Sequence, residues 1–186
     1  SAAMAFRRST PTMGISTFTT VLCICWLFSS TALAINAVLG VDFGTEYIKA
    51  TLVKPGIPLE IVLTKDTRRK ETSAVAFKPI KNTKTGDFPE RVYGSDAIAL
   101  AARFPGDVYP NLKALLGLPA QNNKVLEYSA RHPALKIEGQ TIKGTVAFRS
   151  GAFSADEEPF MVEEIIAMEL QSIQKNAEAM AGKGSI

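Results

Sequence analysis

The sequence predicts a mixed α/β fold, and two patterns along the chain support this prediction. Residues 47–53 and 59–64 alternate apolar and polar side chains with a period of two, which is typical of strands covered on one face. Residues 162–181 instead repeat apolar side chains at the spacing of one face of a helix. Strands early in the chain and a long helix late in it therefore indicate one α/β domain.

The first half of this domain is expected to be an antiparallel meander. The turn residues Lys54-Pro55-Gly56 join two of its strands. In the later of these strands, Leu59, Ile61 and Leu63 alternate with Glu60, Val62 and Thr64. Strands are predicted at about 37–43, 47–53, 59–64, 73–78 and 91–93, with two further short strands at 135–137 and 145–148.

Two short helices and one long helix are predicted. A helix capped by Ser95 or Asp96 reaches residue 102, and a second helix over 110–116 carries Lys113. Residues 150–159 have the composition of a loop. The final helix has Gly182 as its C-cap, and its apolar face is expected to consist of Ile166, Leu170, Ile173, Ala177 and Met180.

Residues 1–34 have the pattern of a leader with a secretory signal peptide. Arg7 and Arg8 precede a short apolar run at 21–28, and Ala32-Leu33-Ala34 has the form of a cleavage site. A retained membrane anchor is the competing interpretation, but the apolar run is too short for a span. We therefore expect cleavage near Ala34/Ile35, no retained membrane span, and a folded domain over 35–186.

Composition argues against several classes of function. The chain has 21 basic and 18 acidic residues, and two of the arginines belong to the leader, so the domain has no basic field for nucleic acid. Both cysteines, Cys23 and Cys25, also lie in the leader. His132 is the only histidine, and without a cysteine partner in the domain it indicates neither a zinc site nor a catalytic triad.

One segment has the residues that binding of a nucleotide phosphate tail requires. Asp42-Phe43-Gly44-Thr45 follows an apolar strand, and Gly44 lets the chain turn sharply so that main-chain N–H groups can approach a phosphate. Thr45 adds a hydroxyl donor, and the carboxylate of Asp42 can hold the water shell of Mg2+. An ordinary hairpin turn favours the same residue types, so the spacing alone leaves both interpretations open.

The segment from Gly40 to Tyr47 resembles the first phosphate motif of the seventy-kilodalton heat-shock chaperones, within the actin-like ATPase superfamily. This resemblance implies an α/β actin-like ATPase (ribonuclease H-like) fold. Because the family's ATPase domain is longer than this chain, it implies the first lobe only, in incomplete form, over residues 35–186. Four further segments match in order: 69–77, where Thr72 replaces the usual proline, 93–97, 111–117 and 162–183.

The resemblance also implies a site that binds ATP or ADP with Mg2+. Asp42 would act on the metal through water, and Lys113 would be the catalytic residue that positions or polarises the attacking water. A solvated helix lysine is the alternative interpretation of Lys113. The implied cofactor-binding residues are four consecutive ones: Gly44, Thr45, Glu46 and Tyr47.

Two features are similar to the large luminal branch of the superfamily, the hundred-and-seventy-kilodalton glucose-regulated class. Glu46 stands where ordinary members usually repeat threonine, and its carboxylate would repel a phosphate unless it turns away or meets a cation. Residues 54–63 and the basic residues 68–70 resemble a segment of that branch. Together with the leader, these features imply the lumen of the endoplasmic reticulum.

The function implied by this resemblance is that of an ATP-binding molecular chaperone in protein folding, which also acts as nucleotide-exchange factor. Its partners would be the ordinary luminal heat-shock chaperone and unfolded client polypeptides. One alternative is a foldase driven by its own ATP hydrolysis, and others are an inactive truncated fragment and a distant sugar-kinase-type enzyme. Glu46 favours the exchange role, and the isolated chain is expected to bind ATP poorly or not at all.

Overall fold

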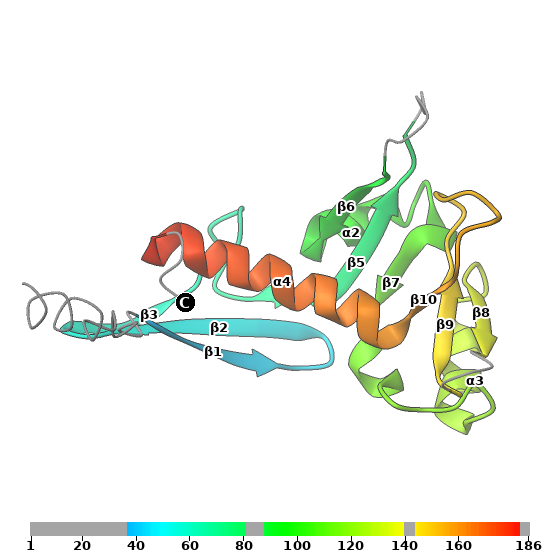
Figure 1. The fold of residues 1–186 in the computed structure, drawn as a ribbon, viewed down its shortest axis with the longest axis horizontal. Coiled ribbons are helices and arrows are strands. Elements are labelled where there is room, and N and C mark those ends of the chain that lie inside the picture. The colour runs from blue at the N-terminus through cyan, green and yellow to red at the C-terminus, as the bar shows by residue number, and fades with distance from the viewer. Residues whose placement is uncertain (1–36, 81–87, 140–143, 183–186) are drawn as a thin grey trace, which may run out of the picture. The chain divides into compact units, whose positions relative to one another are not determined.

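The computed structural model of the 186-residue chain describes residues 37–80, 88–139 and 144–182. The predicted leader lies outside these described residues. Helices and antiparallel sheets form a mixed α/β fold, as predicted (Figure 1). The strands are β1 (Val38–Phe43), β2 (Tyr47–Lys54), β3 (Ile57–Ile61), β4 (Glu71–Thr72), β5 (Ala74–Lys78), β6 (Glu90–Tyr93), β7 (Val108–Pro110), β8 (Lys136–Gly139), β9 (Val146–Arg149) and β10 (Phe160–Met161). The helices are α2 (Gly94–Leu100), α3 (Asn123–Arg131) and α4 (Val162–Ala181), with 3₁₀ turns η1 (Pro105–Asp107) and η2 (Leu112–Leu115).

The first sheet is the predicted antiparallel meander. Its strand order is β1-β2-β3, and the two-residue strand β4 also pairs with β2. The second sheet has the order β6-β5-β7 and the third has the order β10-β9-β8. In the first sheet, the register places Asp42 opposite Lys49 and Phe43 opposite Ile48, so the β1–β2 hairpin turns over residues 44–47.

The two faces of the first sheet are covered unequally. The alternation predicted for β2 is confirmed, because one set of side chains is buried: Ile48, Ala50 and Leu52. Val62, directly after β3, is buried next to this set, whereas Leu59 is 61% and Ile61 is 37% exposed. The reason is the register, since Ile61 pairs with Thr51 and therefore lies on the face away from the buried residues of β2.

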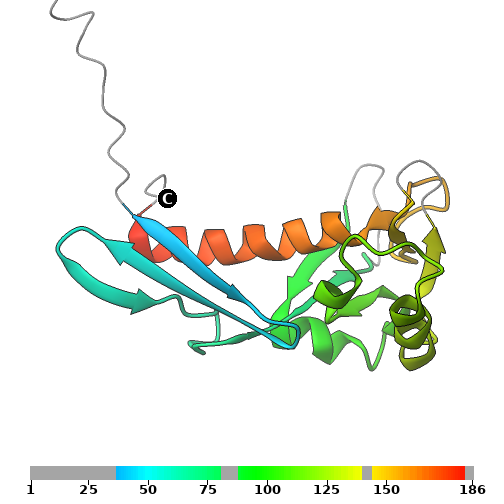
Figure 2. The ribbon, with the colours of Figure 1, turned by 90° about the horizontal axis from the view of Figure 1, so that it is seen from below.

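Helix α4 lies along β2 and β5 and contacts β10 and η2 near its N-terminal end (Figures 1 and 2). The predicted C-cap is confirmed, since the N–H of Gly182 donates to the carbonyl of Glu178 at 2.9 Å. The predicted apolar face is partly wrong, because Leu170 and Met180 are exposed while Glu169 is buried. Within the part of the chain that the structure describes, no helix is both long and apolar enough to cross a bilayer.

The two short helices differ from the prediction. Helix α2 begins at Gly94, after Tyr93, and no side chain caps it, so Ser95 and Asp96 are not its caps. The predicted helix over 110–116 is wrong, because Pro110 ends strand β7 and pairs with Ala74 of β5. Only the 3₁₀ turn η2 remains of that helix, and it carries Lys113.

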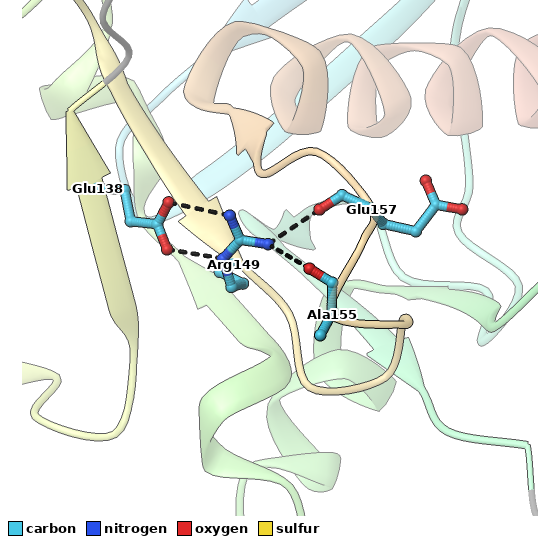
Figure 3. Close-up of polar contacts among 4 residues, drawn as sticks. All are labelled: Glu138, Arg149, Ala155 and Glu157. Carbon is cyan, nitrogen blue, oxygen red and sulfur yellow. Dashed lines mark hydrogen bonds and ion pairs between the residues drawn. The ribbon is translucent and has the colours of Figure 1, made fainter.

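The predicted loop over 150–159 contains neither helix nor strand, and Arg149 holds it in place (Figure 3). The guanidinium of Arg149 makes two hydrogen bonds to the carboxylate of Glu138 across the β8–β9 pair, at 2.7 and 3.2 Å. Its third nitrogen, Nη1, donates to the carbonyls of Ala155 and Glu157 at 3.2 and 2.9 Å. One side chain therefore fixes the loop that leads from β9 into β10 and α4.

Candidate functional site

The turn of the β1–β2 hairpin has the geometry of a tight, donor-rich loop. The N–H of Gly44 donates to the carbonyl of Tyr47 at 3.1 Å, so this amide is already engaged. A Cβ on Gly44 would lie 2.4 Å from that carbonyl oxygen, which no other residue type can accommodate. Among the described residues, the N–H groups of Thr45 and Glu46 have no hydrogen-bond partner. These two exposed amides, rather than that of Gly44, are the free donors of the turn.

Asp42 is a solitary carboxylate at the end of β1. Its side chain is 73% exposed, and its Oδ2 lies 4.0 Å from the Nζ of Lys49. Residues 37–80, 88–139 and 144–182 contain no cluster of three or more histidine, cysteine, aspartate or glutamate side chains suited to a metal ion. A lone exposed carboxylate fits a hydrated Mg2+ ion held through its water shell better than a directly ligated one.

Lys113 lies at this turn although it is 70 residues away in the sequence. Its Nζ donates to the carbonyl of Phe43, the residue between Asp42 and Gly44. On η2, Leu112 and Leu115 are buried on either side of Lys113, which leaves the lysine exposed towards the hairpin. Two motifs that the sequence analysis identified separately are thus in contact.

The segment that carries Lys113 is tied at both ends. The N–H of Asn111 donates to the carbonyl of Ser73 at 2.9 Å, next to the start of β5. At the other end, the N–H of Gly117 donates to the carboxylate of Glu163 in the first turn of α4 at 3.1 Å. The position of Lys113 therefore depends on the packing of η2 against both β5 and α4.

Glu46 lies on the side of the turn that faces α3. It lines a cavity of about 160 Å³ together with Asn111 and two cationic residues of α3, Lys124 and Arg131. The sequence analysis missed α3, although Asn122 is a recognisable N-cap whose side chain accepts from the N–H of Lys124 at 3.0 Å. Without this helix, the cations near Glu46 could not be foreseen.

Tyr47 lies on the exposed face of the hairpin. The residue is 42% exposed, and the Nζ of Lys70 lies 3.9 Å from the centroid of its ring. Since alternate residues of a strand share a face, Tyr47 and Lys49 project from the same side of β2. The structure thus brings Asp42 and Lys113 together with the four consecutive residues 44–47.

Similarity to known proteins bears on the identity of this site. No known family model matches the chain. The chain is 45% identical over 148 residues to the heat shock protein 70 homolog lhs1 of Schizosaccharomyces pombe, a match that covers 78% of this chain and 16% of that protein. It is 37% identical over 150 residues to LHS1 of Saccharomyces cerevisiae, covering 79% and 16%, respectively. It is 35% identical over 148 residues to hypoxia up-regulated protein 1 of Danio rerio, covering 80% and 14%.

These matches cover about four fifths of this chain, while the chain spans 14–16% of the length of the three relatives. The relatives agree with the resemblance found in the phosphate motif and in the segments that follow it. The chain belongs to the heat shock protein 70 superfamily, in the large branch that contains lhs1 and hypoxia up-regulated protein 1.

Proposed function

We propose that residues 35–186 form the first lobe of an actin-like nucleotide-binding domain and that its β1–β2 hairpin binds the phosphates of ATP or ADP with Mg2+. The observation that carries this proposal is the hydrogen bond from Lys113 Nζ to the carbonyl of Phe43. It joins the proposed catalytic lysine to the turn between Asp42 and Gly44. This contact favours a role at the turn over a lysine that is solvated and directed away from the hairpin.

The donor set of the turn suits a hydrated magnesium polyphosphate. The amides of Thr45 and Glu46, the hydroxyl of Thr45 and the ammonium of Lys113 are donors for phosphate oxygens. Asp42 supplies the carboxylate for the water shell of the metal, and bound Mg2+ would neutralise charge on the phosphates. Tyr47 would border the site from the exposed face of the hairpin.

The proposed biological role is that of a chaperone in the lumen of the endoplasmic reticulum. Membership of the heat shock protein 70 superfamily supports a role in protein folding, and the leader over 1–34 supports the luminal location. Within a longer polypeptide of this branch, the domain would serve as nucleotide-exchange factor for the ordinary luminal heat-shock chaperone. Unfolded client polypeptides would be its other partners.

A cycle driven by ATP hydrolysis is the second candidate function. The residues around Glu46 support it. The carboxylate of Glu46 would oppose phosphate binding if it stood alone. It shares its cavity with two cations, Lys124 and Arg131, and with one further acid, Glu127. A Glu46 carboxylate that meets one of these cations would leave Lys113 able to act on a bound nucleotide.

The Lys113→Ala variant separates these two candidates in the full-length polypeptide. We expect single-turnover hydrolysis to fall by about 100-fold, since general positioning and electrostatic groups contribute on this scale. ATP binding is expected to weaken, because one phosphate donor is lost, but at saturating ATP the release of labelled nucleotide from the ordinary luminal chaperone is expected to remain. The exposed Lys78→Ala variant is the control. Loss of exchange in Lys113→Ala at saturating ATP would contradict exchange without hydrolysis and favour the hydrolysis-driven cycle.

A further inference from the structure

The register of the β1–β2 hairpin places a lysine beside Asp42 to which the phosphate motif assigns no role. Lys49 pairs with Asp42 across the two strands, and their charged groups lie 4.0 Å apart. Residues directly opposite each other in an antiparallel pair project from the same face of the sheet. Lys49 thus stands next to the carboxylate that is proposed to hold the water shell of Mg2+.

Both members of this pair are open to solvent. The side chain of Lys49 is 59% exposed and that of Asp42 is 73% exposed. Exposed ion pairs are weak, so the pair can open at little cost when a more highly charged ligand arrives. The four-carbon stem of lysine then lets the ammonium turn towards an anion near the turn.

Two further cations lie close to the same turn. Lys70 lies over the ring of Tyr47, which shares its face of β2 with Lys49, and Lys113 reaches the carbonyl of Phe43. Their charges favour an anionic ligand over a free cation at this end of the hairpin. The carboxylate proposed to receive a hydrated metal thus lies beside one lysine, at an end of the hairpin that two further lysines contact.

We propose that Lys49 is a further binding residue of the phosphate site, and this inference rests on the proposed function. In the free protein its ammonium lies beside Asp42 and lowers the affinity of that carboxylate for free divalent cations. When a polyphosphate binds, Lys49 contributes to holding it. The metal is therefore taken up together with the phosphate chain rather than before it.

The test measures two ligands on the complete chain and on its Lys49→Met variant by titrating backbone amide resonances at low salt. Inorganic tripolyphosphate probes the anion site, and MnCl2 probes the cation site through paramagnetic broadening. Lys78→Met is the matched control, because Lys78 also pairs across two strands with an exposed carboxylate, that of Glu90, at 2.8 Å. In Lys49→Met we expect about threefold weaker tripolyphosphate binding and about threefold stronger Mn2+ binding at Asp42, the scale of one exposed charge. Lys78→Met should match the wild type.

The two proposals fail in different ways. If tripolyphosphate shifts Thr45 and Glu46 in the wild type but binds Lys49→Met equally well, the role of Lys49 is contradicted while the phosphate site stands. Unchanged Mn2+ binding in Lys49→Met would also overturn the role of Lys49. If tripolyphosphate shifts no resonance of the hairpin in the wild type, the phosphate site and the role of Lys49 both fall.

Discussion

Gly44 is the residue with the least freedom in the proposed site. A Cβ at this position would meet the backbone carbonyl oxygen of Tyr47 at 2.4 Å, and a backbone atom cannot move aside as a side chain can. Gly40 in the same strand offers a contrast, because its added Cβ would meet the rotatable hydroxyl of Thr51 at 2.9 Å. The turn therefore requires glycine at position 44 more strictly than at position 40.

The Gly44→Ala variant is expected to be less stable than the wild type by about 1–3 kcal/mol, the usual cost of forcing an atom into a filled space. Gly40→Ala is the matched control and should lose less, since Thr51 can rotate away. Urea unfolding followed by circular dichroism measures both. Equal stability of the two variants would show that the turn opens without cost, contrary to the geometry of the hairpin.

Residues of the candidate site could be predicted from the sequence where they belong to a short motif. Asp42, Gly44 and Thr45 are adjacent, and Lys113 lies in a second matching segment. Lys49 could not be recognised in this way, because its contact with Asp42 depends on the strand register. The hydrogen bond from the N–H of Gly44 to the carbonyl of Tyr47 likewise depends on the folded turn and could not be predicted from the sequence.

Among the elements, α4 contains an acid where its packing face would suit an apolar residue. Glu169 is 3% exposed, and the hydroxyl of Ser73 donates to its Oε2 at 3.3 Å. Among the described residues its Oε1 has no partner. Burial raises the pKa of Glu169 from 4.5 to about 7, the hydrogen bond from Ser73 opposes this rise, and the carboxylate of Glu71 adds to it.

This shift predicts that the domain loses stability as the pH rises. Between pH 4.5 and about 7 the folded protein keeps the proton on Glu169 while the unfolded chain has lost it, so the free energy of unfolding falls by up to about 3 kcal/mol. Urea unfolding at pH 5 and pH 7.5 measures this fall. Glu169→Gln should reduce it and leave the share of Glu71, whose pKa is also raised by burial. A fall as large in Glu169→Gln as in the Glu178→Gln control would contradict the assignment.

Elements were predictable where periodicity was long and strong. The alternation in β2 and the helical repeat in α4 extend over enough positions to be recognised, and β1 was recognised as an apolar run. Four shorter strands, β5, β6, β8 and β9, also lie where they were predicted. The two-residue strand β4 was missed, and β7, which ends at Pro110, lies partly where a helix was predicted. The burial of Glu169 and the exposure of Leu59 follow from packing partners that no local pattern contains.

For the molecule as a whole, the site depends on contacts between distant segments. The hairpin, η2, β5 and α4 must all be in place for Lys113 to reach Phe43, so the proposed phosphate site would exist only in the folded domain. The sequence predicted a mixed α/β domain and the resemblance supplied the order of its motifs. Neither could predict that η2 contacts the hairpin, because the two segments are far apart in the sequence.

The location of a bound nucleotide tests the central claim most directly. Mn2+–ATP is added to the isotope-labelled chain, and paramagnetic broadening of its backbone amides is mapped, a readout that detects even weak binding. The phosphate site predicts that broadening centres on Thr45, Glu46 and Lys113 and fades along β2 and α4. Broadening centred elsewhere, with these three amides unaffected, would contradict it.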